Sequence, residues 1–212
     1  IFSRIQDDNT RLRRAYSQYI VFASLFIFPI LIGMIVLAKP LTLVILKEQW
    51  LPLVPMLQIL CIDWMSDHIC SINLNVLYVK GRSDLALKLE IIKKTLAIII
   101  FFISLYWGII GVCWGRVIYG IIAVYLNSYY TKRLIDISIC QQLKDILIPL
   151  GQSLSMGVVV VIFSNMIHVS LVSNLLYSIL IGALSYLGII ALTGKKYYHE
   201  ILPLLKAVVK RG

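Results

Sequence analysis

Hydrophobic residues gather along this chain in runs of about 20, the length an α-helix needs to cross the hydrocarbon core of a bilayer. The runs are separated by short segments that hold most of the charged residues. This pattern predicts an all-α integral membrane protein with about six transmembrane helices between residues 17 and 193. The six predicted helices lie at 17–38, 53–79, 88–107, 109–130, 146–167 and 172–193.

Composition agrees with a membrane location. Of the 212 residues 60% are hydrophobic and 14% are charged, and the mean hydropathy is +0.90. A soluble domain has roughly half apolar and a quarter charged residues. The chain starts Ile-Phe-Ser-Arg, without Met or a secretory signal pattern, so we expect a fragment whose N-terminal part is missing.

The basic residues predict which side of the membrane each segment occupies. They are concentrated before the first helix, in the second-to-third and fourth-to-fifth connections, and after the last helix, whereas Lys39 and Lys47 lie on the other side. The positive-inside rule assigns the rich side to the cytoplasm. We therefore treat 1–212 as one membrane domain, with 1–16 a cytoplasmic loop or helix and 194–212 a cytoplasmic tail. The net charge of +10 reflects this topology and not a nucleic-acid partner.

The outer connection from Pro40 to Pro55 contains three prolines and Trp50. Proline cannot continue a helix without a break, and tryptophan favours the membrane interface. We expect a short element that lies along the outer surface, anchored by Trp50.

The second predicted helix is unusual because residues 61–75, CIDWMSDHICSINLN, are polar. At 100° per residue one face is polar or small for several turns, and the opposite arc is apolar. Only the apolar arc can meet lipid, so we expect the polar face to meet other helices or water. The polar side chains are Asp63, Asp67, His68, Asn73 and Asn75, and the apolar arc holds Ile62, Met65, Ile69, Ile72 and Val76.

These polar residues allow three interpretations. They can line a water-filled cavity for a polar substrate or a proton, they can be interhelical hydrogen-bonding groups without transport chemistry, or the helix can be interfacial or broken. The cavity interpretation takes Asp63, Asp67, Asn73, Asn75 and Arg116 as substrate contacts. Its candidates for proton coupling are Asp63, Asp67 and His68.

Arg116 lies within the fourth predicted helix, at a depth similar to that of Asp63, so the two residues can pair. It can serve as a cavity cation for an anionic headgroup, or as a snorkelling or ion-paired structural residue. Pro29 is a hinge candidate in the first helix, although static packing explains it equally well.

Motifs of catalysis and of metal or nucleotide binding are missing from the sequence. It contains no Gly-rich phosphate loop, HExxH, GxSxG or His/Cys metal cluster. The four cysteines have no metal-ligand spacing, and His168 and His199 lie at predicted helix ends. We therefore expect a transporter and not an enzyme, with no catalytic residues, cofactor or metal.

Several short patterns occur in a familiar order. They are FSRIQDDNTRLRRAY at 2–16, Pro29, LAKPL at 37–41, Trp50 with Pro52, LQIL at 57–60, GRSD at 81–84, and Gly108 with Gly111. Over residues 1–165 this order resembles the Wzx-type polysaccharide transporter family, in particular its lipopolysaccharide and colanic acid exporters. One departure is LKEQW before Pro52, where relatives often have glycine before the tryptophan.

The resemblance implies the C-terminal part of a MATE/MOP-like transporter of 12 to 14 helices in a bacterial inner membrane, with both termini of this chain cytoplasmic. It further implies flipping of an undecaprenyl-diphosphate-linked oligosaccharide, an O-antigen or exopolysaccharide unit, to the periplasmic leaflet by alternating access. Coupling to a proton or sodium gradient, contact with membrane lipids and partnership with glycan polymerase or export machinery would accompany that activity. The family supplies no catalytic set to transfer to these positions.

Three other functions remain open from the sequence. The first is a MATE-like drug/cation antiporter of the same superfamily. The second is a membrane glycan polymerase or acyltransferase subunit, which would commonly place catalytic Arg or His residues in large loops, whereas the outer loops here are short. A purely structural membrane subunit would explain the topology but not the polar face.

Overall fold

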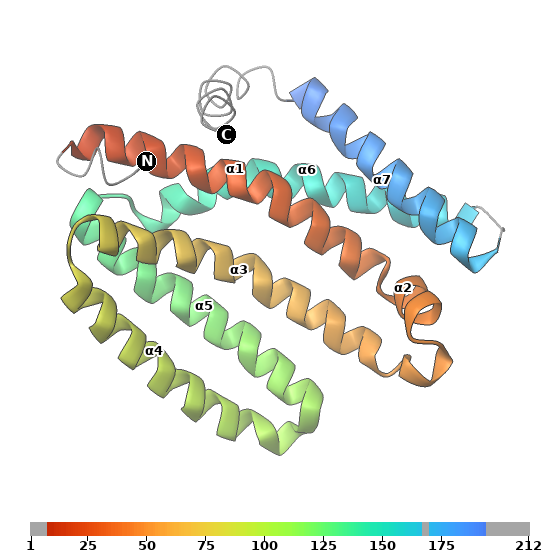
Figure 1. Ribbon diagram of the computed structural model, residues 1–212, viewed down its shortest axis with the longest axis horizontal. Coiled ribbons are helices and arrows are strands. Elements are labelled where there is room, and N and C mark those ends of the chain that lie inside the picture. Colours follow the sequence, from red (N-terminus) through yellow and green to blue (C-terminus); the bar gives the residue numbers. More distant parts are fainter. Residues whose placement is uncertain (1–7, 167–169, 194–212) are drawn as a thin grey trace.

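The computed structural model describes residues 8–166 and 170–193, and within them all regular structure is helical (Figure 1). The six predicted helices are present as the six long helices of this part of the chain, which confirms the all-α fold. In chain order the elements are α1 (Asn9–Val36), α2 (Ala38–Ile45), η2 (Glu48–Trp50), α3 (Leu53–Val79), α4 (Ser83–Ser104), η3 (Leu105–Trp107), α5 (Gly108–Ile135), α6 (Ile139–Met166) and α7 (Leu171–Thr193).

Several helices extend beyond the apolar runs that predicted them. α1 begins at Asn9, so residues 9–16 are its first turns and not a separate element. The Asp8 side chain caps this end by accepting hydrogen bonds from the backbone N–H groups of Thr10 and Arg11. A helix continues through charged residues because Arg and Lys have good helix propensity, so the end of an apolar run does not fix the helix end. Residues 1–7, the tail 194–212, His168 and His199 lie outside the described residues.

By length and composition, four stretches of the described chain are apolar enough to cross a membrane. They are 9–36, 83–135, 139–166 and 171–193, and the second contains both α4 and α5. α3 is as long as these helices, with 27 residues, but its polar side chains lower its hydropathy. The connection between α1 and α3 forms α2 and η2, and Trp50 is 48% exposed at its end.

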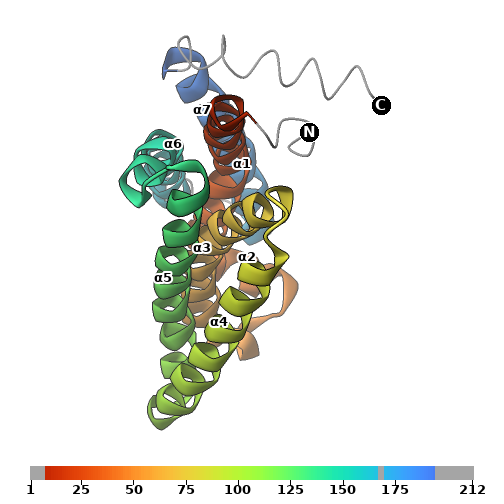
Figure 2. The ribbon, with the colours of Figure 1, turned by 90° about the vertical axis from the view of Figure 1, so that its left-hand side faces the viewer.

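The helices pack in two layers, with α1, α3 and α4 on one side and α5 and α6 on the other (Figure 2). α3 packs extensively against α5 and α1, α1 packs along α6, and α7 covers α6. Gly81 and Gly108, with φ of +66° and +70°, form the turns that precede α4 and open α5. α3 therefore has protein on two sides and is the element on which the site depends.

A buried hydrogen-bond network joins four helices at one level of the bundle. Asn73 Oδ1 on α3 accepts from the Tyr16 hydroxyl of α1 at 2.7 Å and from the Thr131 hydroxyl of α5 at 2.8 Å. Asn73 Nδ2 donates to Gln142 Oε1 of α6 at 3.0 Å, and Ser128 donates to the same oxygen at 2.9 Å. All five side chains are buried. The network fixes the relative positions of α1, α3, α5 and α6, which apolar contacts alone specify less strictly.

A second buried interaction compensates for Pro29 within α1. Proline has no N–H, so the carbonyl of Leu25, four residues earlier, loses its helical partner. The Tyr186 hydroxyl of α7 donates a hydrogen bond to the Leu25 oxygen at 2.6 Å. α7 is therefore attached to α1 at the carbonyl that the proline frees.

We expect Asn73→Ala to lower the free energy of unfolding in detergent micelles by about 2 kcal/mol, because it leaves two buried hydroxyls without their acceptor. Asn75→Ala is the matched control, since Asn75 is exposed on the same helix; its effect should stay within about 0.5 kcal/mol. Equal losses from the two variants in an SDS-unfolding titration would show that the network does not stabilise the bundle.

Tyr186→Phe should cost about 1 kcal/mol in the native background, the value of one buried hydrogen bond. In a Pro29→Ala background the same substitution should cost much less, because alanine at that position supplies the N–H that the Leu25 carbonyl needs. A double-mutant cycle of unfolding free energies measures this difference. A cost that is identical in both backgrounds would contradict the link between the proline and the tyrosine.

Candidate functional site

The polar residues of α3 lie in different environments, some buried and some exposed, with His68 between the two. Asp63 and Asn73 are buried, whereas Asp67 and Asn75 are exposed. Most of the apolar arc, the face that could have met lipid, is covered by protein. Ile69, Ile72 and Val76 belong to the hydrophobic core, and only Ile62 is exposed. The spacing located two faces correctly, but α1 packs on the apolar one, and a sequence does not show which helix covers which face.

Asp63 and Arg116 form an ion pair between α3 and α5, as their similar depths allow. Arg116 Nη2 lies 2.7 Å and Nε 3.1 Å from Asp63 Oδ2. The Asp63 side chain is 2% exposed, and that of Arg116 is 45% exposed. The guanidinium also lies 5.2 Å from the centre of the Tyr119 ring, within cation–π range. The pair is thus open to its surroundings only from the arginine side.

Gly120 provides the space for this ion pair. A Cβ at residue 120 would lie 2.8 Å from Asp63 Oδ1. Glycine is therefore required at this position, because only its hydrogen atom fits against the carboxylate.

His68 and Asn73 lie apart from this ion pair. His68 Nε2 is 3.0 Å from the Ser24 hydroxyl of α1, and its ring packs edge-on against Phe28 at 5.2 Å. Asn73 belongs to the buried network described above. The predicted site residues therefore do not form one cluster: Asp63 pairs with α5, His68 contacts α1, and Asn73 joins four helices.

The exposed side of α3 carries a row of polar and aromatic side chains, which we call the α3 ladder: Trp64, Asp67, Ser71, Asn75 and Tyr78. Their spacing of three or four residues places them on one side of the helix. Trp64 is 62% and Tyr78 is 52% exposed. Sequence analysis missed both aromatic residues, although the same helical spacing relative to Asp67 would have found them.

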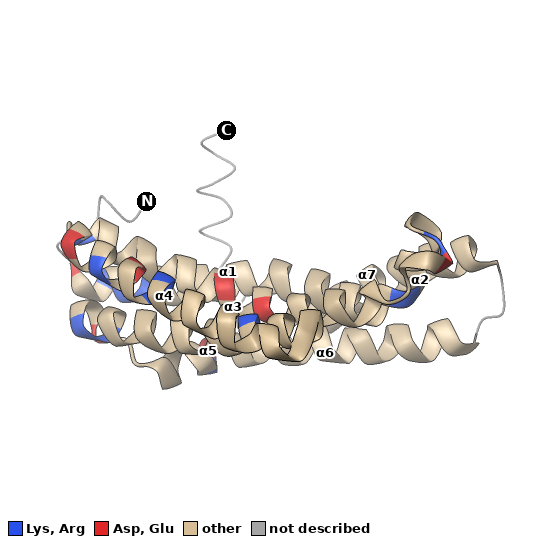
Figure 3. Ribbon diagram, turned by 90° about the horizontal axis from the view of Figure 1, so that it is seen from below, with Lys and Arg blue, Asp and Glu red and all other residues tan. Residues whose placement is uncertain are grey.

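Lys93, one of the basic residues that the sequence analysis used only to predict the topology, lies inside the bundle. Lys93 of α4 is buried and forms an ion pair with Glu90, one turn earlier. Figure 3 shows Lys and Arg concentrated at the end where α1 begins and α3 meets α4, with a smaller group of both charges midway along the bundle. Charge therefore occurs within the helices as well as at their ends.

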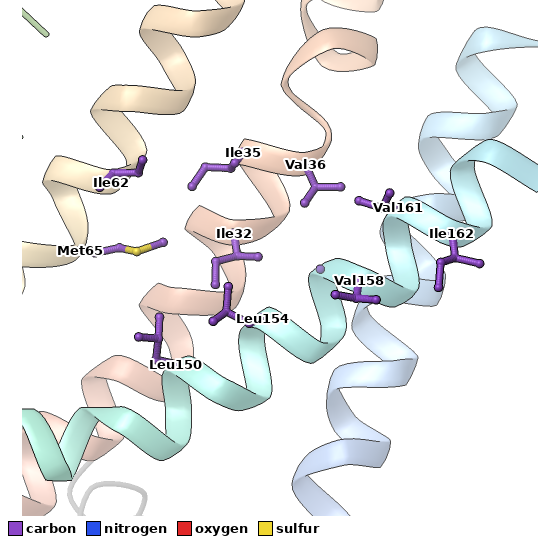
Figure 4. Close-up of a pocket in the computed structure, with 11 residues that line it drawn as sticks. Ile32, Ile35, Val36, Ile62, Met65, Leu150, Leu154, Val158, Val161 and Ile162 are labelled. Atoms are coloured by element: carbon purple, nitrogen blue, oxygen red, sulfur yellow. The ribbon is translucent and has the colours of Figure 1, made fainter. Parts of the chain in front are cut away.

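A cavity of about 470 Å³ lies between α1, α3 and α6 (Figure 4). None of its described lining residues carries a charged, hydroxyl or amide side chain, so these residues offer no side-chain hydrogen bond to a polar substrate. They are Ile32, Ile35, Val36, Ile62, Met65, Leu150, Leu154, Gly157, Val158, Val161 and Ile162. Within residues 8–166 and 170–193 no group of three or more His, Cys, Asp or Glu side chains is arranged to hold a metal ion.

Comparison with known families and curated proteins confirms the resemblance to polysaccharide transporters. Residues 1–55 match the family model described as a polysaccharide biosynthesis protein. An uncharacterized membrane protein in the cps region of Klebsiella pneumoniae is 25% identical over 99% of this chain and 44% of its own length. The lipopolysaccharide biosynthesis protein WzxC of Escherichia coli K12 is 28% identical over 60% of this chain and 26% of its own. The teichuronic acid biosynthesis protein TuaB of Bacillus subtilis is 24% identical over 88% and 40%.

The fold is that of a known flippase. The solved structure of the lipid II flippase MurJ, in an inward closed conformation, superposes with a TM-score of 0.74. It is 21% identical, and the match covers 95% of this chain and 42% of that one. The chain thus spans less than half the length of the relatives it matches. It is a multi-pass membrane protein with a MurJ-like fold.

We expect Arg116→Met to destabilise the protein by about 3 kcal/mol, because it leaves the Asp63 carboxylate buried without its counter-ion. Asp63→Asn should cost only about 1 kcal/mol, since the arginine that remains is half exposed and can be solvated. Unfolding free energies in detergent micelles measure both effects, with Arg133→Met at the exposed end of α5 as control. Equal costs, or a larger cost for Asp63→Asn, would contradict the asymmetry of the pair.

Proposed function

We propose that this chain forms part of a flippase that moves an undecaprenyl-diphosphate-linked oligosaccharide from the cytoplasmic to the periplasmic leaflet of a bacterial inner membrane. The observation that carries the proposal is the exposure of the α3 ladder and Arg116 at membrane depth, on helices arranged as in a flippase. The named relatives, from three bacteria, support it because two of them are biosynthetic proteins for lipopolysaccharide and teichuronic acid.

A flippase has to shield a polar glycan and a diphosphate while the polyprenyl chain remains in lipid. Polar side chains facing acyl chains would lack hydrogen-bond partners, so exposed polar groups at this depth require a water-filled space. Asp67 and Asn75 meet this condition, because they are exposed on α3. We propose that the ladder faces such a space, which opens alternately to either side of the membrane.

Arg116 is the proposed contact for the diphosphate. Asp63 accepts from two of the five N–H groups of its guanidinium, so three remain for another acceptor. Arginine binds phosphate oxygens in a fixed planar geometry, and its 45% exposure leaves it accessible. Asn73, in contrast, is removed from the proposed substrate contacts, because its side chain is buried and hydrogen-bonded to three other helices.

Coupling to a proton or sodium gradient would use carboxylates within the membrane. Asp67 is exposed, and the structure gives it no ion pair among the described residues, whereas Asp63 is buried and paired. We therefore propose Asp67 as the site that takes up the coupling ion. Asp63 would be affected indirectly, when its partner Arg116 binds the diphosphate. His68 contacts Ser24, so its proposed role would lie in the α1–α3 contact next to Pro29 and not at the carboxylates.

The exposed carboxylate of Asp67 also suits a MATE-like drug/cation antiporter, which needs an acidic site for a cationic drug. The two functions differ in what Arg116 would do, since a half-exposed arginine repels a cation and attracts a diphosphate. Rescue of drug resistance by the full-length gene, without any effect on surface glycan, would favour the antiporter.

The full-length gene should restore surface glycan to a flippase-deficient strain. Asp67→Asn should then reduce export by at least about tenfold, the equivalent of about 1.4 kcal/mol, and should flatten its dependence on pH. Asp136→Asn is the matched control, because Asp136 lies at the end of α5 with a positive φ that asparagine tolerates. Lipid-linked glycan on each leaflet is the measurement.

Two results would contradict different parts of this proposal. Lipid-linked glycan that remains on the cytoplasmic leaflet when the native gene is expressed would refute the flippase function. Export and pH dependence that are unchanged in both Asp63→Asn and Asp67→Asn would exclude these carboxylates as the coupling site.

A further inference from the structure

We infer that the α3 ladder binds the sugar units of the transported molecule, with Trp64 and Tyr78 as stacking surfaces and Asp67, Ser71 and Asn75 as hydrogen-bonding partners for hydroxyl groups. The inference rests on the proposed function and adds to it a division of the substrate between two helices. α3 binds the glycan, and Arg116 of α5 binds the charged headgroup.

The chemistry of the ladder fits a carbohydrate. Sugar rings have apolar C–H faces and hydroxyl edges, and the ladder alternates between groups suited to each. Tryptophan and tyrosine offer flat apolar surfaces with one polar group, while carboxylate, hydroxyl and amide groups donate to and accept from hydroxyls. From Trp64 to Tyr78 the row extends about 21 Å at 1.5 Å per residue, enough to follow more than one sugar ring.

Charge argues against the diphosphate as the occupant of this row. α3 has no lysine or arginine between residues 53 and 79, and the only charges along it are Asp63 and Asp67. Asp63 is neutralised by Arg116, so the exposed part of the helix is acidic at Asp67. An anionic headgroup is repelled there and is attracted to Arg116, whereas neutral sugar hydroxyls hydrogen-bond to the carboxylate.

Exposure excludes a structural role for most of these side chains within the described bundle. Buried polar residues of α3 are engaged with other helices: Asn73 in the network, Asp63 with Arg116. The ladder side chains are exposed instead, and the two aromatic residues are more than half exposed. Trp64 and Tyr78 therefore contribute little to the described core, although each is among the largest side chains of the helix.

The test compares two probes with the full-length protein in detergent micelles. One probe is the undecaprenyl-diphosphate-linked oligosaccharide extracted from the bacterium that encodes the protein, and the other is undecaprenyl diphosphate without sugar. Trp64→Ala and Asn75→Ala should each weaken binding of the glycan-bearing probe by about tenfold and leave binding of the sugar-free probe unchanged. Trp64→Phe should retain most of the affinity, because it keeps an aromatic face.

Trp114→Ala is the matched control, since Trp114 is an exposed tryptophan of α5 that lies outside the ladder. It should change the affinity for neither probe. If Trp64→Ala fails to fold, Ser71→Ala and Asn75→Ala remain informative, because both remove small exposed groups.

Water access to the ladder gives a second readout. With Cys140 replaced by serine, Ser71→Cys should react with a membrane-impermeant thiol reagent, and the glycan-bearing probe should protect it better than the sugar-free one. Ile118→Cys, on the exposed apolar surface of α5, should not react.

The outcomes separate this inference from the proposed function. Native protein that binds or exports neither lipid refutes the flippase. Native protein that binds both probes, with ladder variants that lose both equally or neither, refutes the ladder as the glycan site and leaves the flippase intact. A Ser71→Cys thiol that never reacts would show that another helix covers the ladder, which also refutes it.

Discussion

A polar side chain at membrane depth has to face protein or water, and this constraint organises the whole bundle around α3. In hydrocarbon an unpaired amide or carboxylate costs several kcal/mol, so each polar group of α3 needs a partner helix or an aqueous surface. Asn73 obtains three partners from three helices, Asp63 obtains an arginine from α5, and His68 contacts Ser24 of α1, whereas Asp67, Ser71 and Asn75 lie in an exposed row. The positions of α1, α5 and α6 around α3 follow from these requirements.

The network and the ion pair differ in how much freedom they leave. Around Asn73 every contact is neutral, buried and shared among four helices, which holds that level of the bundle rigidly. Asp63 precedes Asn73 by ten residues on α3. At that level its partner, Arg116 of α5, is partly exposed and accessible. The structure thus combines a buried, four-helix hydrogen-bond network with a charged site that is accessible from the arginine side.

The sequence predicted the number and approximate positions of the long helices, because apolar runs of membrane-spanning length are a strong signal. It also located the polar region of α3 and a pairing that Asp63 and Arg116 do form. It did not predict that Ile69, Ile72 and Val76 are covered by protein, because helical periodicity gives faces but not neighbours. Trp64 and Tyr78 were overlooked for a related reason: they were counted as hydrophobic, and only the structure shows that they are exposed in one row with Asp67 and Asn75.

Pro29 and Tyr186 lie in different helices, more than 150 positions apart, yet both determine the hydrogen bonding of the Leu25 carbonyl: the proline cannot donate to it, and the tyrosine does. If the proline were replaced during evolution, the new residue would supply the helical N–H, and the tyrosine hydroxyl would no longer be needed as a donor. A lineage that kept the proline would retain the tyrosine, or another donor in its place. We therefore expect positions 29 and 186 to covary among relatives, because both act on the hydrogen bonding of the Leu25 carbonyl.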